Sequence, residues 1–357
     1  MSIKIFAGHN ALSRLKEEGL SAEQLSLIVG ASGGPKWLVL SKLDQYLNDH
    51  FLPKASQPID LIGSSIGAWR MACYAQQNPS AAIQKLCEGY SSQVYEGRPS
   101  PARVSESARE ILEGFLGDAT DPYGHQDFII NNRSRRLNVV TVRNRLMFNH
   151  SSNLVQGLAL GAAALVNPVR SAAVEKLFPR VVFSQESAAS PYRNLKLKEQ
   201  ITLTSANLTP ALAASGAIPF VLEPIKVPGS SDRWHWDGGL VDYHFAGPFK
   251  QSDDLVLYPH FYPKLIPGWL DKALPWRRVN PKAFDNVVVL CPSHEFIDTL
   301  PDQHVPERKD FEQYDTATRI KNWQRVIHLS EQLVGDLHDA MEKDGGRSLV
   351  QPLEHMS

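Results

Sequence analysis

The sequence predicts a protein of the α/β class, with a parallel sheet covered by helices. The first observation is that two short apolar runs alternate with two segments of helical spacing between residues 25 and 77, an order typical of parallel sheets. The second is composition: 43% of the 357 residues are hydrophobic and 21% are charged. These values are ordinary for a globular chain that buries a sizeable core.

The alternating elements come early in the chain. Residues 25–29 and residues 59–62 are apolar runs that each end at a glycine, and we expect both as buried strands. A glycine-containing turn follows each run, and helical spacing then covers residues 36–49 and 68–77. The two strand–helix units therefore place two loops at the same edge of the predicted sheet.

The remaining elements are less regular. Residues 96–126 mix glycine and proline without a clear period, and we interpret them as an insertion or a cap. No repeat, low-complexity tract or linker interrupts the chain, so we expect one domain over residues 1–357, with a C-terminal extension of unassigned role from about residue 246. We expect strands at residues 137–142, 181–184, 201–204, 255–258 and 287–290, and helices at residues 154–166, 208–215 and, with one break, 310–343.

Charge and cysteine content narrow the function classes. The net charge of −1 gives no reason to expect a nucleic-acid partner. Cys73, Cys87 and Cys291 are far apart, without metal-ligand spacing, and an odd, sparse set fits a reducing compartment better than a disulfide framework. The N-terminal residues do not resemble a signal peptide, and the longest apolar stretch, 158–166, is too short to span a bilayer. We expect a cytoplasmic protein without a metal or cofactor.

The pattern Gly63-x-Ser65-x-Gly67 lies between the second predicted strand and the helix after it. A serine in this context sits on a sharp strand-to-helix turn with its hydroxyl exposed. The glycines avoid the crowding that a Cβ would cause, and the helix N-terminus directs free N–H groups at a developing anion. The pattern predicts Ser65 as a nucleophile. An ordinary glycine–serine turn is the alternative.

The glycine-rich loop from Gly30 to Lys36 also joins a predicted strand to a predicted helix. Backbone N–H groups in such a loop can hold the anion that forms during acyl transfer, and Gly33 and Gly34 are the candidates. A phosphate-binding loop would need a different glycine spacing and a serine or threonine after the lysine, where this chain has Trp37. A tight structural turn remains the alternative.

Asp237 is the strongest candidate for the base that a serine nucleophile needs. Gly238 and Gly239 follow it and allow a sharp turn that directs the carboxylate inward, and desolvation would raise its proton affinity. An ordinary Asp-Gly turn is the alternative. None of the 12 histidines stands in an obvious late-loop motif, and the available candidates for a histidine base are His235, His244 and His294.

Taken in their order, these motifs resemble the patatin-like phospholipase family, which combines a glycine-rich oxyanion loop, a G-x-S-x-G turn and a later D-G-[GA]. Residues 214–220 (Ala-Ser-Gly-Ala-Ile-Pro-Phe) are similar to the family's A-S-x-A-I-P turn, so the resemblance spans about residues 25–242. Lys36 matches a position where arginine is usual, and Trp37 departs from the usual glycine. The resemblance implies a patatin-like three-layer α/β/α sandwich with a mainly parallel central sheet.

The resemblance also implies a lipid acyl hydrolase that cleaves carboxylic esters of phospholipids, lysophospholipids or related compounds. Ser65 and Asp237 would form a catalytic dyad that works through an acyl-enzyme, and Gly33, Gly34 and the N–H of Ile66 would form the oxyanion hole. Supporting roles would fall to Lys36, Gly63, Gly67, Gly238 and Gly239.

Two other functions stay open from the sequence. One is a carboxylesterase of the α/β-hydrolase type with a Ser-His-acid triad, and the other is a catalytically inactive lipid-binding protein. The expected partner is a lipid or acyl ester, with transient contact to a membrane surface. The aromatic and basic segment 262–278 fits a surface loop better than a membrane-interface helix, because prolines interrupt it and its helical period is poor.

Overall fold

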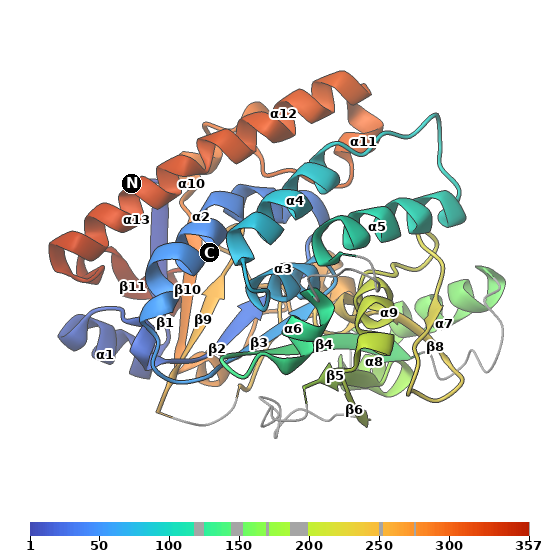
Figure 1. Cartoon of the computed structure of the whole chain (residues 1–357), viewed down its shortest axis with the longest axis horizontal. Helices are drawn as coiled ribbons and strands as arrows, with labels where there is room; N and C mark the ends of the chain where they lie inside the picture. The colour runs from blue at the N-terminus through green and yellow to red at the C-terminus, as the bar shows by residue number, and fades with distance from the viewer. Residues whose placement is uncertain are drawn as a thin grey trace.

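A mainly parallel sheet forms the centre of the computed structural model (Figure 1). The structure describes residues 1–117, 125–143, 153–168, 171–185, 199–249, 253–274 and 276–356. The strands are β1 (Ile3–Ala7), β2 (Leu25–Gly30), β3 (Ile59–Ser64), β4 (Arg135–Arg143), β5 (Arg180–Ser184), β6 (Glu199–Thr202), β7 (Ile225–Lys226), β8 (Trp234–Asp237), β9 (Leu255–Pro259), β10 (Val287–Pro292) and β11 (Val350–Pro352).

The strand order is β11-β1-β10-β9-β2-β3-β4-β5-β6, and the short β8 pairs with both β4 and β7. The run from β10 through β4 is parallel throughout, whereas β1 and β5 join their neighbours β10 and β4 in antiparallel fashion. The prediction of a mixed α/β fold with a mainly parallel central sheet is confirmed. The C-terminal third of the chain supplies β9 and β10, which lie between β1 and β2.

Strand register brings the predicted motifs to one edge of the sheet. Gly30, at the end of β2, pairs with Gly63 near the end of β3, and Ser64 pairs with Val140 of β4. Asp237 ends β8 opposite Thr141 of β4. Because parallel strands end at a common edge, the loops after β2 and β3 emerge side by side.

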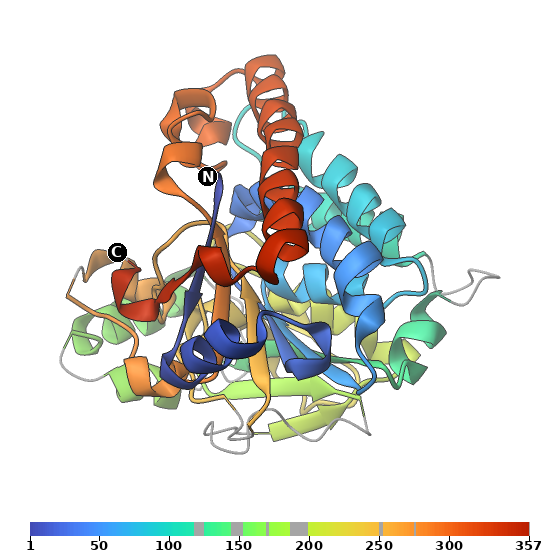
Figure 2. The same cartoon turned by 90° about the vertical axis from the view of Figure 1, so that its left-hand side faces the viewer.

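Helices flank this sheet (Figure 2). Helices α2, α3, α4, α12 and α13 pack on one another on one side, and α1 contacts the edge strand β11 and its neighbour β1. The α-helices are α1 (His9–Glu18), α2 (Ser41–Tyr46), α3 (Ile66–Tyr74), α4 (Pro79–Ser91), α5 (Pro101–Leu116), α6 (His125–Asn131), α7 (Asn153–Val166), α8 (Ser171–Leu177), α9 (Ser205–Ser215), α10 (His294–Ile297), α11 (Asp310–Gln313), α12 (Thr316–Leu329) and α13 (Glu331–Asp344).

A buried ion pair joins α3 to α2. Arg70 donates to both carboxylate oxygens of Asp44 at 2.8 and 2.7 Å, and the Tyr74 hydroxyl donates to the same group at 2.9 Å. All three side chains are fully buried. A charge is tolerated in such a place only when it is paired and hydrogen-bonded, so this network holds the two helices in one arrangement.

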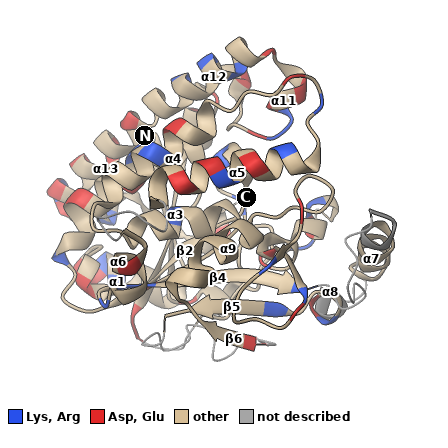
Figure 3. Ribbon diagram, turned by 45° about the vertical axis from the view of Figure 1, so that its right-hand side comes forward, with Lys and Arg blue, Asp and Glu red and all other residues tan. Residues whose placement is uncertain are grey.

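Three elements differ from the sequence prediction. The helix expected over residues 36–49 begins as the 3₁₀ helix η2 (Gly34–Leu40), continues as α2 and ends in the π-turn η3 (Leu47–Phe51). Part of the segment interpreted as an insertion, residues 96–126, is the amphipathic helix α5, and residues 118–124 lie outside the described part. The amphipathic stretch 310–343 breaks twice, giving α11, α12 and α13, and the charged residues within α12 are all basic (Figure 3).

Among the described helices, none combines the length and apolar character needed to cross a bilayer. The helix α7 contains no charged residue, and its inner side packs Ala159 and Ala163 into a small core with Trp236 and Leu240. Leu165 on the same helix is 82% exposed. An apolar helix with an apolar exposed side is unusual on a protein surface.

Candidate active site

Ser65 occupies a strained turn between β3 and α3. Its φ of 54° and ψ of −133° lie in a region that residues other than glycine rarely adopt. The flanking glycines are sterically required, because a Cβ on Gly63 would lie 2.3 Å from Gly67 and one on Gly67 would lie 2.0 Å from the carbonyl oxygen of Gly30. The close approach of the backbones of β2, β3 and α3 thus fixes the turn and raises the serine above the sheet edge.

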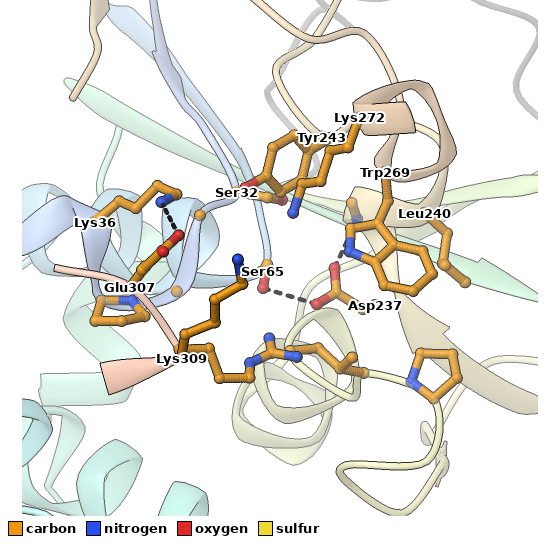
Figure 4. Close-up of a pocket in the computed structure, with 17 residues that line it drawn as sticks. Ser32, Lys36, Ser65, Asp237, Leu240, Tyr243, Trp269, Lys272, Glu307 and Lys309 are labelled. Carbon is orange, nitrogen blue, oxygen red and sulfur yellow. Dashed lines mark hydrogen bonds and ion pairs between the residues drawn. The ribbon is translucent and has the colours of Figure 1, made fainter. Parts of the chain in front are cut away.

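The hydroxyl of Ser65 faces the carboxylate of Asp237 (Figure 4). Ser65 Oγ donates to Asp237 Oδ2 at 2.8 Å, and the backbone N–H of Gly239 donates to Asp237 Oδ1 at 2.7 Å. Both residues are only 6% exposed. One carboxylate oxygen is therefore held by the turn, and the other is free to accept the proton of Ser65.

Burial changes the acidity of Asp237. Desolvation of the carboxylate raises its pKa to about 6, and the hydrogen bonds from Ser65 and Gly239 oppose this rise only in part. A carboxylate with a pKa near neutrality takes up a proton more readily than an ordinary aspartate. The environment therefore suits Asp237 to proton transfer with Ser65.

The segment 214–220, which contains Ser215, forms hydrogen bonds with both Ser65 and Asp237. The Ser215 hydroxyl accepts a hydrogen bond from the backbone N–H of Ser65 at 2.9 Å and donates to the carbonyl of Val140 at 2.7 Å. Two residues later, Ala217 accepts a hydrogen bond from the N–H of Asp237 at 3.0 Å. This turn therefore connects the loop that contains Ser65 to the strand that ends at Asp237. The backbone N–H of Ser65 is engaged in one of these structural hydrogen bonds.

The two glycines after Asp237 lie against neighbouring backbone and side chains. A Cβ on Gly238 would lie 2.3 Å from the carbonyl oxygen of Val140, and one on Gly239 would lie 2.6 Å from Ser32 Oγ. Ser32 in turn shares a 2.7 Å hydrogen bond with Ser64, next to the predicted nucleophile. The glycines therefore allow the aspartate loop to pack directly on the glycine-rich loop.

Three backbone N–H groups in the loops near Ser65 lie at the starts of helices. Gly33 is the N-cap of η2, Gly34 is its first residue, and Ile66 is the first residue of α3. The first N–H groups of a helix have no acceptor within that helix. Gly34 has a φ of 59°, and a Cβ there would approach the Tyr90 hydroxyl at 3.6 Å, on the open side of the loop. The glycine-rich loop and the turn that precedes α3 therefore both lie near the hydroxyl of Ser65.

Two cavities meet at Ser65. The first, which we call the cationic cavity, has a volume of about 320 Å³ and contains Asp237 as well as the basic side chains Lys36, Lys272, Arg308 and Lys309 (Figure 4). The second, the apolar cavity, has a volume of about 700 Å³. Most of its lining is apolar or aromatic, from Ile66, Trp69, Tyr90, Tyr95, Val104, Ala108, Ile111, Ile218, Phe220, Val221, Leu222, Phe311 and Tyr314. The charged residues Arg98, Arg308, Glu312 and Arg319 also line it.

The tryptophans near the motifs do not all reach a cavity. Trp69 lines the apolar cavity, whereas Trp236 is buried in the small core beneath α7 and Trp234 stacks with Lys226 on the far end of β8. The glycine-loop lysine, Lys36, forms an ion pair with Glu307 at 3.1 Å. Trp37, the departure from the family pattern, is fully buried in the main core.

Among the described residues, no histidine lines either cavity. His235 is buried between Thr141 and Ser230, and desolvation lowers its pKa to about 3. His244 is buried against Tyr243 and accepts from the N–H of Ile266, with a pKa far below the usual value because of burial. His294 is the exposed first residue of α10. The geometry gives none of them a contact with Ser65.

Several cavity residues have no counterpart in the motif analysis. Trp269 and Lys272 come from the segment 262–278, which forms in part the 3₁₀ helix η6 (Trp269–Ala273) rather than an irregular loop, and Glu307, Arg308 and Lys309 precede α11. These residues lie in the C-terminal third of the chain. The only sequence feature that their two segments share is a local excess of basic residues. Within the described residues, His, Cys, Asp and Glu side chains do not gather into a group of metal ligands.

Comparisons with known proteins give two findings. A family model described as patatin-like phospholipase matches residues 50–249, more than half of the chain. A solved structure, human GIVD cytosolic phospholipase A2, is similar with a TM-score of 0.38 and 12% identity, over 95% of this chain and 62% of that chain. This chain thus spans less than two thirds of the length of that structure. A search of curated proteins gave no match.

Proposed function

The chain belongs to the patatin-like phospholipase family, and we propose that it hydrolyses acyl esters of lipids with Ser65 as nucleophile and Asp237 as base. The observation that carries the proposal is the 2.8 Å hydrogen bond from Ser65 Oγ to the buried carboxylate of Asp237, made from a strained turn. A strained serine that donates to a desolvated carboxylate is the arrangement expected of an activated nucleophile.

Acylation begins when Ser65 Oγ attacks the carbonyl carbon of the ester and its proton passes to Asp237 Oδ2. The carbonyl oxygen becomes an anion that the N–H groups of Gly33, Gly34 and Ile66 stabilise. When the tetrahedral intermediate collapses, the bond to the alcohol oxygen breaks and Asp237 returns the proton to that oxygen. The alcohol leaves, and Ser65 carries the acyl group as an ester.

Deacylation reverses the roles. A water molecule gives its proton to Asp237 and attacks the acyl carbonyl, and the same N–H groups hold the second oxyanion. Collapse breaks the bond to Ser65 Oγ, which regains the proton from Asp237, and the fatty acid leaves. One carboxylate with a pKa of about 6 thus serves as base and acid in each half-reaction.

The size and lining of the apolar cavity support a long acyl chain as its occupant. It contains about 700 Å³, more than twice the volume of the cationic cavity, and side chains of α5, α3 and residues 216–222 line it. Removing each methylene group of an acyl chain from water is worth about 0.8 kcal/mol. A hydrocarbon chain therefore gains most by entering this cavity.

Exposed apolar side chains beside the apolar cavity support contact with a lipid surface. Phe220 lines the cavity, is 47% exposed and lies near Gly157 of α7, the helix that also exposes Leu158 and Leu165. A surface of this kind can rest on a lipid aggregate while the cavity receives one chain. We therefore propose that the protein contacts lipid surfaces transiently.

Active-site labelling tests the proposal directly. A fluorophosphonate should react with purified protein, and peptide mapping should place the adduct on Ser65. The same protein should hydrolyse p-nitrophenyl esters, with faster turnover of apolar acyl chains than of acetate, and Ser65→Ala should abolish both reactions. An adduct on Ser32 or Ser64, or labelling that persists in Ser65→Ala, would remove Ser65 from the mechanism.

A further inference from the structure

The hydroxyl of Tyr90 lies beside the glycine-rich loop. Tyr90 is in the last turn of α4 and lines the apolar cavity together with Ser65 and Gly34. A Cβ on Gly34 would lie 3.6 Å from this hydroxyl, on the open side of the loop. The backbone N–H of Gly34 is one of the oxyanion donors proposed above, so a side-chain donor lies next to a backbone donor.

Aromatic packing fixes the ring of Tyr90. Trp37 of η2 meets it edge to face, with the ring planes at 90° and the centroids 6.3 Å apart, and Trp69 of α3 meets it at 72° and 6.5 Å. Both tryptophans are buried, and α4 packs against both η2 and α3. Pairs of this geometry stabilise one ring orientation. A donor that is held in place before the reaction stabilises a developing charge without a cost of reorganisation.

The Tyr90 hydroxyl has its hydrogen available for a ligand. Among the described residues this hydroxyl has no hydrogen-bond partner, although the backbone carbonyl of Tyr90 accepts from Gln93 Nε2 at 2.8 Å. The hydroxyl of Tyr95, which lines the same cavity, instead donates to Gln93 Oε1 at 2.8 Å. Desolvation raises the pKa of Tyr90, and the negative charge of Asp237 adds to the rise. Tyr90 therefore keeps its proton at neutral pH and acts as a donor.

The meeting point of the two cavities limits where the carbonyl of an ester can lie. Four residues line both cavities: Ser65, Gly34, Ile218 and Arg308. A carbonyl beside Ser65 therefore extends one half of the ester into each cavity. The acyl half enters the apolar cavity, as proposed above, and Tyr90 forms the wall of that cavity next to Gly34. A carbonyl oxygen that accepts from the N–H of Gly34 is thus within reach of the Tyr90 hydroxyl.

We propose that Tyr90 is a further catalytic residue, whose hydroxyl donates a hydrogen bond to the carbonyl oxygen of the ester as that oxygen becomes an anion. The proton stays on Tyr90 throughout, and the hydrogen bond strengthens as negative charge develops. The same donor serves the second oxyanion, during deacylation. This proposal rests on the acyl hydrolase function proposed above. Because the interaction is stronger with the anion than with the neutral carbonyl, it should act on kcat more than on KM.

Tyr90→Phe tests this role, because it removes the hydroxyl oxygen and keeps the ring that packs on Trp37 and Trp69. We expect kcat to fall about tenfold to a hundredfold on both p-nitrophenyl butanoate and p-nitrophenyl dodecanoate, the scale of one hydrogen bond to a charged group. The factor should be the same for the two chain lengths, and KM should change little. Thermal melting would establish that the variant is folded.

Tyr46→Phe is the matched control. The hydroxyl of Tyr46 pairs with His338 Nδ1 at 3.3 Å, and Tyr46 lines neither cavity, so kcat and KM should stay at their wild-type values. An unchanged kcat in folded Tyr90→Phe protein would overturn the role of Tyr90 as a donor. A loss confined to the dodecanoyl ester or to KM would also overturn it, and would identify Tyr90 as part of the wall that holds the acyl chain.

A ketone that forms the oxyanion without turnover tests the hydrogen bond itself. Ser65 should add to the carbonyl carbon of a dodecyl trifluoromethyl ketone, and the hemiketal oxygen then stands for the oxyanion. Carbon-13 NMR of a ketone labelled at this carbon would report the pH at which the hemiketal oxygen takes up a proton. Tyr90→Phe should raise that pH, because the anion loses a donor, and should weaken ketone binding by about the factor lost from kcat. An unshifted titration would overturn the proposal.

Failure of this proposal is distinguishable from failure of the hydrolase function. Wild-type protein that hydrolyses both esters and is labelled at Ser65, with Tyr90→Phe equally active, would overturn only the role of Tyr90. Wild-type protein that neither hydrolyses the esters nor reacts with a fluorophosphonate would overturn the acyl hydrolase function, and the role of Tyr90 with it.

Discussion

The two cavities that meet at Ser65 differ in both lining and origin. The apolar cavity is lined by α3, α5 and residues 216–222, together with the start of the α11–α12 region. The cationic cavity combines the glycine-rich loop and the Asp237 turn with residues 269–272 and 307–309. The hydroxyl of Ser65 and the carboxylate of Asp237 lie where the two cavities meet.

This difference distinguishes the residues proposed to carry out the reaction from the residues that would select the substrate. Close backbone contacts restrict the residues at Gly63, Gly67 and Gly238, and these restrictions fix the positions of Ser65 and Asp237, the proposed catalytic pair. The residues that distinguish the two cavities are side chains on α5, on η6 and before α11, and we expect substitutions there to leave the turn around Ser65 intact. Changes at the junction should therefore affect all substrates, and changes in one cavity should affect one half of the substrate.

The largest loss of turnover should come from substitutions of Ser65 and Asp237, where the two cavities meet. Asp237→Asn keeps the shape of the side chain but removes a useful base, so turnover of every ester should fall by about three orders of magnitude or more, as far as in Ser65→Ala. The double substitution should lose little beyond either single one, because the two residues act as a unit. Steady-state rates on a short and a long p-nitrophenyl ester would measure all three variants.

Histidine substitutions are the counterpart of that experiment. His294→Gln should retain most of the activity, and so should His235→Gln and His244→Gln in any variant that folds, because none of these histidines reaches a cavity. If one folded histidine variant were inactive while Asp237→Asn kept most of its turnover, a Ser-His-acid triad would replace the dyad.

Gly34→Val should produce the next largest effect. Gly34 lines both cavities and has a φ of 59°, so a branched side chain strains the loop and points toward Tyr90. Turnover should fall about a hundredfold on all acyl chains, the scale of losing one oxyanion donor. Gly229→Val, at another positive φ far along the chain, controls for backbone strain alone. A chain-length-dependent loss would place Gly34 in the apolar cavity only.

A change confined to the apolar cavity should alter chain-length preference. Ala108→Trp adds a large ring to the side of α5 that lines this cavity, and kcat/KM for dodecanoyl esters should fall about tenfold or more relative to butanoyl esters. Ala102→Trp, on the exposed side of the same helix, is the matched control. An equal fall for both chain lengths would show that the ring disturbs the catalytic pair rather than the acyl half.

The smallest expected effect is a shift in the pH dependence of kcat/KM, caused by a charged residue that lines the cavities. Because Asp237 must be ionised to act as base, kcat/KM should rise with pH through a midpoint near 6. Arg308→Gln removes a positive charge that favours the ionised carboxylate, so this midpoint should move to higher pH. A midpoint near the ordinary value of about 4 would contradict the desolvation of Asp237.

Most of the fold that positions the pair follows from local sequence. The runs at residues 25–29 and 59–62 are short, apolar and bounded by glycine, and they form β2 and β3 with little change. The turns after them need glycine for steric reasons that the pattern already expresses. The strand β1, in contrast, is short and has Lys4 within it, and its place beside β10 depends on a partner hundreds of residues away.

The parts of the site that escaped prediction share a physical cause. Lys272 and Arg308 have no motif, because a cation acts through its position in space and the chain can supply it from any nearby loop. Ser215 was visible in a motif, but its two hydrogen bonds to Ser65 and Val140 depend on the packing of α9 against the sheet. The assignment of 262–278 to the surface missed Trp269 and Lys272 for the same reason.

The backbone of Ser65 has a consequence for the choice of an inactive protein. A side chain at φ 54° costs about 1–3 kcal/mol, and Ser65→Ala keeps that cost. Ser65→Gly removes both the hydroxyl and the Cβ, and the relief should outweigh the extra entropy that glycine loses on folding, about 0.5–1 kcal/mol. Thermal melting should rank Ser65→Gly above Ser65→Ala, which makes the glycine variant the better vehicle for trapping an intact ester in a crystal.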